Sequence, residues 1–429
     1  MIRHWLWRDI FPDVPVMIRY ILLFMSLCCL LRLESNEVVF IVTGDLHGRL
    51  ADLAALAPVI SKYPRAVKVD LGDMVQGNYA MVRADGLPVI RAFNILGYDL
   101  LIPGNHDLEF SLPVLQMWQR EFRGEILAAQ WQLAGIDLPG YKVIERDGCR
   151  IGVIGLGDVG LKKLAGYWKE LTYTDVVSAV RLIVPELQKA GCDAIVLLCH
   201  ISVSNYLTIN RLLYEVPEID AIAGAHSHRE EPGRVINGVL AVQPGAYGQS
   251  AVKLTLVFDE KRKFLYASSQ LLRPGKNKDD RIMNLMREAE RAARKEGGEL
   301  LAVFPDRQQF GEAAAEMIRR AAGADMAVFS FNAGRFSRDI TRKKLFEMLP
   351  YGNRIAVISM SPDDVVLLQE KFSGRPGYFF SGRPTGKMVK VAMSDFLLTR
   401  IPGLGKNAVV LPVFERLELE RVLKTGKIR

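Results

Sequence analysis

The sequence predicts an α/β protein with two domains. Between residues 37 and 273, short apolar runs alternate with stretches that have the hydrophobic period of a helix. Many of the runs are apolar at successive positions, which indicates strands covered on both faces, as in a sheet between other layers. The composition changes near residue 274, and a second set of helix and strand patterns follows from residue 300 to 429.

Length and composition are those of a large folded protein. The chain has 429 residues, of which 49% are hydrophobic and 24% charged, so it can bury a sizeable core. The formal net charge of +8 favours anionic ligands through the long-range field. No Lys/Arg block interleaved with aromatic residues is present, so nothing indicates binding to a nucleic acid duplex.

Residues 1–36 are expected to be a signal peptide or an N-terminal membrane anchor. Residues 20–31 form an uncharged apolar run between Arg19 and Arg32, about as long as a signal-peptide core and short for a membrane span. Read from Met17, the segment looks like a signal peptide, so the start is either Met1 or Met17. No Ala-x-Ala site ends the run, which leaves an uncleaved anchor, or a buried helix of the fold, as alternatives. The prediction is an exported, periplasmic or cell-surface protein.

The larger domain is predicted to span residues 37–273. Its expected helices are 51–62, 88–96, 111–121 and 174–190. Its expected strands are 38–43, 67–71, 100–103, 150–156, 194–198, 219–223, 240–244 and 251–258. Because α/β folds place their sites on loops at the strand ends, polar residues directly after these strands are the candidate functional residues.

Five of the strands are followed by acid, amide or imidazole side chains. In the first stretch, Asp45 and His47 are two residues apart in a turn between Gly44 and Gly48, so both can reach one metal ion. Five of the 6 histidines of the chain lie in such stretches, the exception being His4, and scattered structural histidines would not be distributed in this way. The predicted metal ligands are Asp45, His47, Asp73, Asn105, His200, His226 and His228.

This many ligands exceeds the need of one ion. The set suits two divalent ions about 3.5–4 Å apart that share one carboxylate. Asp73 is the natural bridge, because it lies between the other ligand groups in the sequence and a carboxylate has two oxygens. Mixed carboxylate and imidazole ligation favours Mn, Zn, Fe or Co over Mg or Ca, which prefer oxygen ligands.

The ligand motifs resemble the five signature blocks of the calcineurin-like metallophosphoesterases. Residues 70–77, 93–99 and 242–248 are similar to the 5'-nucleotidase and UDP-sugar hydrolase family within that group. The resemblance covers nearly all of residues 38–259 and implies a four-layer metallophosphoesterase β-sandwich flanked by helices. The blocks are Asp45-x-His47, Gly72-Asp73, Gly104-Asn105-His106-Asp107, His200 and Gly224-x-His226-x-His228.

The resemblance also implies a role for each residue of the blocks. One metal would be held by Asp45, His47, Asp73 and His228, and the second by Asp73, Asn105, His200 and His226. His106 would face the phosphate, stabilise the transition-state charge and assist the leaving group. An acid orients this His in the family; here it is Glu109, three residues further on, or Asp107, and we favour Glu109. The two metals would activate a water for in-line attack on phosphorus.

After the larger domain the sequence predicts a linker helix and a smaller domain of mixed α and β structure. The linker is expected at residues 274–299, with a charged amphipathic helix over 279–296. The smaller domain is expected at residues 300–429, with helices 311–322 and 341–348. Its expected strands are 326–331, 354–360, 388–393 and 409–413.

The smaller domain resembles the C-terminal nucleotide-binding domain of the same family. The resemblance rests on Asn332-Ala333-Gly334, Pro350-Tyr351-Gly352-Asn353 and Ser394-Asp395-Phe396-Leu397. It implies that Tyr351 and Phe396 sandwich a nucleobase, although both rings can also be ordinary core. The family's Gly-Gly-Asp-Gly after this Phe is replaced here by residues 399–405. The implied substrate-binding residues are Asn332, Arg335, Arg338, Tyr351, Asn353 and Phe396.

The sequence therefore predicts a hydrolase that releases phosphate from small phosphoesters, most readily 5'-nucleotides, with two divalent metal ions. Enzymes of the same family that act on UDP-sugars, cyclic nucleotides or thiosulfate esters are the alternatives. An alternative of another class is a non-catalytic nucleotide-binding protein, which the complete set of metal ligands disfavours.

Overall fold

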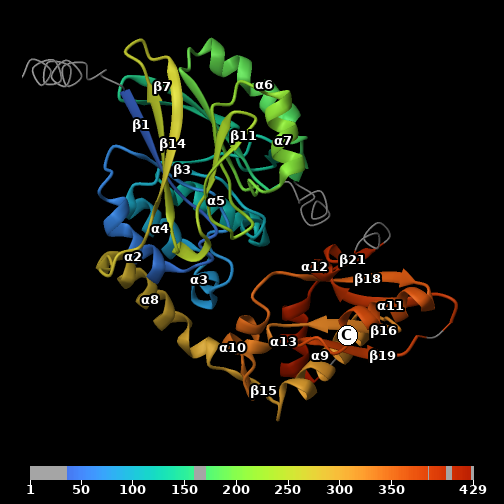
Figure 1. Cartoon of the computed structure of the whole chain (residues 1–429). Helices are drawn as coiled ribbons and strands as arrows, with labels where there is room; N and C mark the ends of the chain where they lie inside the picture. Colours follow the sequence, from blue (N-terminus) through green and yellow to red (C-terminus); the bar gives the residue numbers. More distant parts are fainter. Residues whose placement is uncertain (1–35, 159–170, 385, 402–407, 427–429) are drawn as a thin grey trace, which may run out of the picture.

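The computed structural model describes residues 36–158, 171–384, 386–401 and 408–426. We call residues 36–272 the N-terminal part and residues 300–426 the C-terminal part; helix α8 (Asp280–Gly297) runs between them (Figure 1). The predicted signal or anchor segment lies outside the described residues except for Asn36. In the ranges that are described, no helix is long and apolar enough to cross a membrane.

The N-terminal part contains two six-stranded sheets. In the first, β1, β2, β3 and β4 run parallel, β13 pairs antiparallel with β1, and β14 pairs antiparallel with β13. Its strands in spatial order are β14 (Phe264–Leu272), β13 (Ala251–Phe258), β1 (Asn36–Thr43), β2 (Val67–Asp70), β3 (Leu100–Leu101) and β4 (Glu125–Ile126).

The second sheet has a parallel centre and antiparallel edges. Strands β7, β9, β10 and β12 are parallel, whereas β6 and β11 pair antiparallel at the two sides. Its strands in spatial order are β11 (Glu231–Ile236), β12 (Val239–Gln243), β10 (Ala221–Ala223), β9 (Ala194–Cys199), β7 (Cys149–Leu156) and β6 (Tyr141–Arg146). A small separate ribbon pairs β5 (Trp131–Leu133) with β8 (Leu171–Tyr173).

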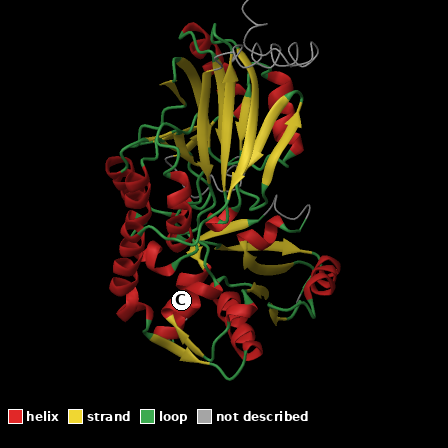
Figure 2. Cartoon of the chain, turned by 60° about the vertical axis from the view of Figure 1, so that its left-hand side comes forward, coloured by secondary structure: helices red, strands yellow, loops and turns green. Residues whose placement is uncertain are grey.

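The two sheets pack face to face, and helices cover their outer faces. Phe40 and Val69 of the first sheet and Val153 and Val196 of the second are fully buried in the core between the sheets. Helices α6 (Val176–Lys189) and α7 (Tyr206–Glu215) cover the second sheet. The first sheet is covered by α2 (Leu50–Ile60), α3 (Tyr79–Arg83), α4 (Leu87–Leu96), α5 (Leu112–Glu121) and α8. The predicted four-layer α/β architecture is thus confirmed (Figures 1 and 2).

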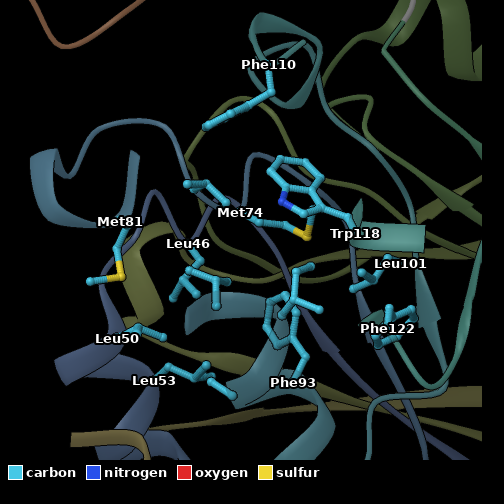
Figure 3. Close-up of a cluster of buried hydrophobic side chains, with 14 of the residues drawn as sticks. Leu46, Leu50, Leu53, Met74, Met81, Phe93, Leu101, Phe110, Trp118 and Phe122 are labelled. Carbon is cyan, nitrogen blue, oxygen red and sulfur yellow. The ribbon is translucent and has the colours of Figure 1, made fainter. Parts of the chain in front are cut away.

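One hydrophobic cluster lies directly beneath the strand ends of the first sheet. Trp118 of α5 and Phe93 of α4 pack there with Met74, which follows Asp73 in the loop after β2 (Figure 3). Leu46, between Asp45 and His47, also points into the cluster. Leu46 and Met74 are the apolar sequence neighbours of predicted ligands, and their burial anchors the two loops that carry those ligands.

The C-terminal part is a five-stranded sheet with helices on both faces. Its strand order is β19 (Tyr378–Gly382), β16 (Met326–Ser330), β20 (Val389–Ser394), β18 (Arg354–Met360) and β21 (Val409–Phe414). One face packs on α9 (Arg307–Ala321), α10 (Arg342–Met348) and α13 (Glu415–Thr425), and the other on α11 (Pro362–Phe372) and α12 (Asp395–Thr399). Strands β15 (Leu300–Val303) and β17 (Asp339–Thr341) pair antiparallel in a separate two-stranded ribbon.

Helix α8 belongs to the helical layer of the N-terminal part. Ile282, Ala289 and Ala293 are buried in the same cluster as Trp118. The helix also touches α10 of the C-terminal part. The expected linker helix is therefore packed along its apolar face against the N-terminal part.

Candidate metal centre

The predicted ligands follow five strands whose carboxyl ends meet at one edge of the sandwich. Asp45 follows β1, Asp73 follows β2 and Asn105 follows β3, all in the first sheet. His200 directly follows β9, and His226 and His228 follow its parallel neighbour β10 in the second sheet. The site therefore lies where loops of both sheets converge.

The backbone at the ligands is strained. Residues other than glycine rarely adopt positive φ, and each such position costs on the order of 1–3 kcal/mol. Backbone hydrogen bonds hold these loops in place, including Asp45 N to the Gly72 carbonyl at 2.8 Å and His47 N to the Asp73 carbonyl at 2.9 Å. Five predicted ligands have positive φ: Asp45 (51°), His47 (50°), Asp73 (53°), His226 (78°) and His228 (59°).

The ligand atoms form two groups that share Asp73. Within each group the atoms lie within 4.8 Å of one another, which suits coordination of one ion. The first group contains Asp45, His47, Asp73 and His228, and the second contains Asp73, His200 and His226. In the second group, Nε2 of His200 lies 3.3 Å from Oδ2 of Asp73.

Asn105 completes the second group. Nδ1 of His226 lies 3.0 Å from Oδ1 of Asn105 and 3.3 Å from Nε2 of His200. His226 therefore turns Nδ1 rather than Nε2 toward the group. The structure thus brings all seven predicted ligands together.

Backbone carbonyls orient two of the imidazoles. Nδ1 of His47 lies 2.6 Å from the carbonyl oxygen of Gln76, and Nδ1 of His200 lies 2.6 Å from the carbonyl oxygen of Leu71. Each carbonyl accepts the Nδ1 proton, so the Nε2 lone pair points toward the group. This is the tautomer that a metal-binding histidine requires.

The electrostatics of the site fit a cation. Asp45 is fully buried, and its Oδ1 accepts no hydrogen bond from the described residues. Burial raises the pKa of Asp45 to about 7, with the Asp73 carboxylate adding to the rise and His200 opposing it. A buried carboxylate oxygen without a hydrogen-bond partner is costly, and a divalent ion among these oxygen and nitrogen donors would remove that cost.

His106 lies beside the groups and pairs with Glu109. Nδ1 of His106 is 2.5 Å from Oε1 of Glu109, and the His106 backbone N–H donates to Oδ1 of Asp73 at 2.9 Å. Burial acts to lower the pKa of His106, but the carboxylates of Glu109 and Asp73 outweigh it and raise the pKa to about 9. The two carboxylates therefore favour the protonated imidazole.

Asp107 does not orient His106, which corrects the alternative that gave it this role. Its carboxylate is fully buried and accepts hydrogen bonds from the backbone N–H groups of Asp73, Met74 and Gly104, at 2.8, 3.0 and 2.8 Å. These bonds occupy both oxygens and join the loops that follow β2 and β3. The role of Asp107 is to hold the ligand loops together.

Two residues of the site were not predicted. The amide Nε2 of Gln76 donates to Oε2 of Glu109 at 2.5 Å, and Oη of Tyr247 lies 3.1 Å from Nδ1 of His228. Both lie inside the family-like segments 70–77 and 242–248. Their place in those segments was the only available signal, because neither residue type stands out as a ligand.

The C-terminal part reaches the site through its loop before β18. Tyr351 stacks on His106 with ring centroids 4.5 Å apart, and the backbone N–H of Gly352 donates to Oε2 of Glu109 at 2.7 Å. The carbonyl of Asn353 accepts from the N–H of Glu415 at the start of α13.

The other predicted substrate residues lie on the surface of the C-terminal part. Asn332, Arg335, Arg338 and Phe396 are exposed, and the guanidinium of Arg400 lies 4.9 Å from the centre of the Phe396 ring. Within the described ranges, none of these four residues forms a hydrogen bond, ion pair or ring contact with the predicted metal ligands.

Sequence comparison identifies relatives for the N-terminal part. Residues 38–230 match the family described as calcineurin-like phosphoesterase. A 2',3'-cyclic-nucleotide 2'-phosphodiesterase/3'-nucleotidase from Salmonella typhimurium is 26% identical over 279 residues, which cover 53% of this chain and 42% of that protein. A 5'-nucleotidase from Rattus norvegicus is 25% identical over 240 residues, 48% of this chain and 41% of that protein. The chain thus spans less than half the length of these curated relatives.

Solved structures show the same fold over nearly the whole chain. A 5'-nucleotidase precursor from Thermus thermophilus superimposes with a TM-score of 0.67 at 18% identity, covering 92% of this chain and 97% of that one. A sulfate thiohydrolase from Thermus thermophilus superimposes with a TM-score of 0.65 at 13% identity, covering 91% and 94%. Residues 38–230 of this chain are therefore similar to the calcineurin-like phosphoesterase family.

Proposed function

We propose that this chain hydrolyses phosphoesters with two divalent metal ions. The observation that carries the proposal is the pair of ligand groups that share Asp73, with His106 and its partner Glu109 beside them. Asp45, His47, Asp73 and His228 would hold one ion, and Asp73, Asn105, His200 and His226 the other. Mn, Zn, Fe and Co suit this mixed donor set.

Each side chain then has a defined task. Bound at these residues, two divalent ions supply an activated water and charge stabilisation at the phosphate. Asp73 would bridge the groups, and the carbonyls of Gln76 and Leu71 hold the imidazoles of His47 and His200 in the tautomer that binds metal. His106, with Nδ1 on Glu109, keeps Nε2 to donate a proton to the leaving-group oxygen.

The proposed substrates are 5'-nucleotides. Support comes from the nucleotidase names of the relatives and from the position of Tyr351, whose ring lies directly on His106. We propose that Tyr351 and Phe396 contact the base, and that Asn332, Arg335, Arg338 and Asn353 contribute to nucleotide binding. A base that stacks on Tyr351 would use the face opposite His106 or displace the ring from it.

Phosphate release by the metal-stripped, Mn-reloaded protein tests this proposal. The substrates are 5'-AMP, UDP-glucose, a 2',3'-cyclic nucleotide and an aryl phosphate, with thiosulfate-ester cleavage measured separately. Preference for 5'-AMP supports the proposed substrate class. Activity on the aryl phosphate alone would overturn the nucleotide assignment and leave the metal chemistry standing.

A second candidate is a diesterase that acts on cyclic nucleotides. The Salmonella relative, named as a cyclic-nucleotide phosphodiesterase and 3'-nucleotidase, favours it. Faster cleavage of the 2',3'-cyclic nucleotide than of 5'-AMP would support this candidate. Tight nucleotide binding with no turnover in Mn would instead support a non-catalytic nucleotide-binding protein.

We also propose export, on the basis of the apolar run at residues 20–31. The segment would direct the protein to the periplasm or the cell surface, cleaved or retained as an anchor. Cell fractionation together with N-terminal sequencing of the mature protein tests this; an intact N-terminus in the cytosolic fraction would contradict it.

A further inference from the structure

Tyr247 lies in a strained turn that is fastened to the first metal loop. The turn, η3 (Ala246–Gly248), follows β12, and Tyr247 has φ +59°, a conformation that is unfavourable for an aromatic residue. Its backbone N–H donates to the carbonyl oxygen of Asp45 at 2.8 Å. The backbone of Tyr247 is therefore held in a fixed position relative to Asp45, a predicted ligand.

The phenol of Tyr247 meets the side of His228 that faces away from the metal group. Its Oη lies 3.1 Å from Nδ1 of His228. Nε2 of the same ring points the other way, 3.6 Å from Oδ1 of Asp45 and 3.1 Å from Nε2 of His47. If Oη accepts the Nδ1 proton, the Nε2 lone pair is directed into the group, as metal binding requires.

Tyr247 differs from the groups that orient His47 and His200. Those two rings rest on backbone carbonyls, which only accept hydrogen bonds. A phenol hydroxyl both accepts and donates, so it can connect His228 to a further group. Tyr351 is the candidate for that further group, because both tyrosine rings lie against His47, with centroid distances of 5.4 Å for Tyr247 and 6.1 Å for Tyr351.

Tyr247 and Tyr351 belong to different parts of the chain and meet at His47. Tyr351 comes from the loop before β18 in the C-terminal part, and its ring stacks on His106. The backbone of its neighbour Gly352 donates to Glu109, the partner of His106. A set of contacts thus runs from His228 through Tyr247, His47 and Tyr351 to His106.

We propose that Tyr247 is a positioning residue that orients His228 for metal binding and links this orientation to the seating of Tyr351 on His106. The inference rests on the proposed function, because it takes His228 as a metal ligand. Tyr247 itself touches no reacting atom in this account.

The test uses Tyr247→Phe in the full chain, which removes Oη and keeps the ring beside His47, with centroids 5.4 Å apart in the wild type. Mn is titrated into the metal-stripped protein without substrate. The expected result is about 10–100-fold weaker Mn binding, the usual effect of losing the partner of a ligand histidine. The melting temperature of the metal-free protein should stay close to that of the wild type, and excess Mn should restore most of the lost turnover.

The matched control is Tyr266→Phe, which removes the same atom from an exposed tyrosine on β14. It should bind Mn as the wild type does. Equal Mn affinity in Tyr247→Phe and the wild type would overturn the orienting role and leave the proposed function intact. A wild type that binds no Mn would overturn the proposed function itself, so the two failures are distinguishable.

A double-mutant cycle tests the link to Tyr351. Tyr247→Phe and Tyr351→Phe are each expected to raise KM at saturating Mn, because each removes one of the two hydroxyls that the proposal links. If the two hydroxyls act together, the double variant raises KM no more than the stronger single variant. Multiplicative effects would overturn the link. If Tyr247→Phe does not fold, Tyr351→Phe alone tests the link, because it leaves the turn intact. An unchanged KM in Tyr351→Phe would then overturn the link.

Discussion

At the scale of single residues, Glu109 shows how one carboxylate serves both parts of the chain. It accepts from Nδ1 of His106, from the amide of Gln76 and from the backbone N–H of Gly352. The first bond favours the protonated imidazole, and the third holds the Tyr351 loop next to it. Position and protonation of His106 therefore depend on the same side chain.

His106→Ala tests the role of the imidazole. Turnover of the preferred phosphoester should fall about 10²–10⁴-fold, the usual contribution of a positioned proton donor. The metal content measured by elemental analysis should stay near that of the wild type, because His106 is in neither ligand group. Loss of both metals in this variant would show that the assigned role is wrong.

Gly104→Ala tests the close packing of the ligand loops. A Cβ at Gly104 would lie 2.2 Å from Oδ1 of Asp73 and 2.7 Å from Cε1 of His200, so the bridging carboxylate must move. We expect Mn affinity to fall at least about tenfold in calorimetric titration.

Gly275→Ala is the control for this variant, because the nearest atom to its new Cβ is 3.9 Å away. It should bind Mn as the wild type does. Unchanged Mn affinity in Gly104→Ala would contradict the placement of Asp73 as the bridge.

The residues of the two candidate ligand groups were predictable from the sequence, but several contacts that hold them in place were not. Asp, Asn and His after successive buried strands indicate metal binding by residue type alone. Gln76 acts on His47 through its backbone carbonyl, and a carbonyl carries no residue-type signal. The choice between Asp107 and Glu109 likewise depended on loop geometry, because both acids follow His106 closely.

At the scale of elements, predictions succeeded where burial was uniform. Strands β1 and β9 are apolar at successive positions because both of their faces are covered. Strand β14 was not predicted, since most of its residues are at least partly exposed and no clear apolar pattern results. Helix α9 begins at Arg307 rather than at the expected 311, because the Asp306 side chain caps it by accepting from Gln309 N–H.

The start of helix α13 carries a buried acid that makes stability depend on pH. Glu415 is 2% exposed, and its Oε1 accepts no hydrogen bond from the described residues. Burial, with a smaller contribution from Asp395, raises the pKa of Glu415 to about 8, against 4.5 for an ordinary Glu. Between these values the folded state keeps a proton that the unfolded state has lost, so stability falls as pH rises.

Glu415→Gln should remove this dependence. The wild-type free energy of unfolding should fall by up to about 1.4 kcal/mol per pH unit from this group between pH 4.5 and 8. The difference in stability between the variant and the wild type, measured by thermal denaturation, should therefore favour the variant more at pH 8 than at pH 5. Glu370→Gln, at an exposed site on α11, is the control. Parallel pH profiles for Glu415→Gln and the wild type would refute the assignment.

At the scale of the whole molecule, the C-terminal part contributes directly to the candidate site. Glu109 and Gly352 are 243 positions apart in the chain and are joined by a hydrogen bond. The sequence predicted Tyr351 as a substrate residue but not its stacking on His106, because that contact depends on how the two parts pack together. The predicted boundaries at residues 37–273, 274–299 and 300–429 stay predictions.

We propose that the two ligand groups hold two ions and that both ions are needed for hydrolysis. The most direct test is to titrate the metal-stripped full chain with Mn and follow bound metal and phosphate release together. Two Mn should bind per chain, with activity appearing only as the second site fills. Saturation at one Mn per chain with full activity, or phosphate release that persists in excess chelator, would contradict it.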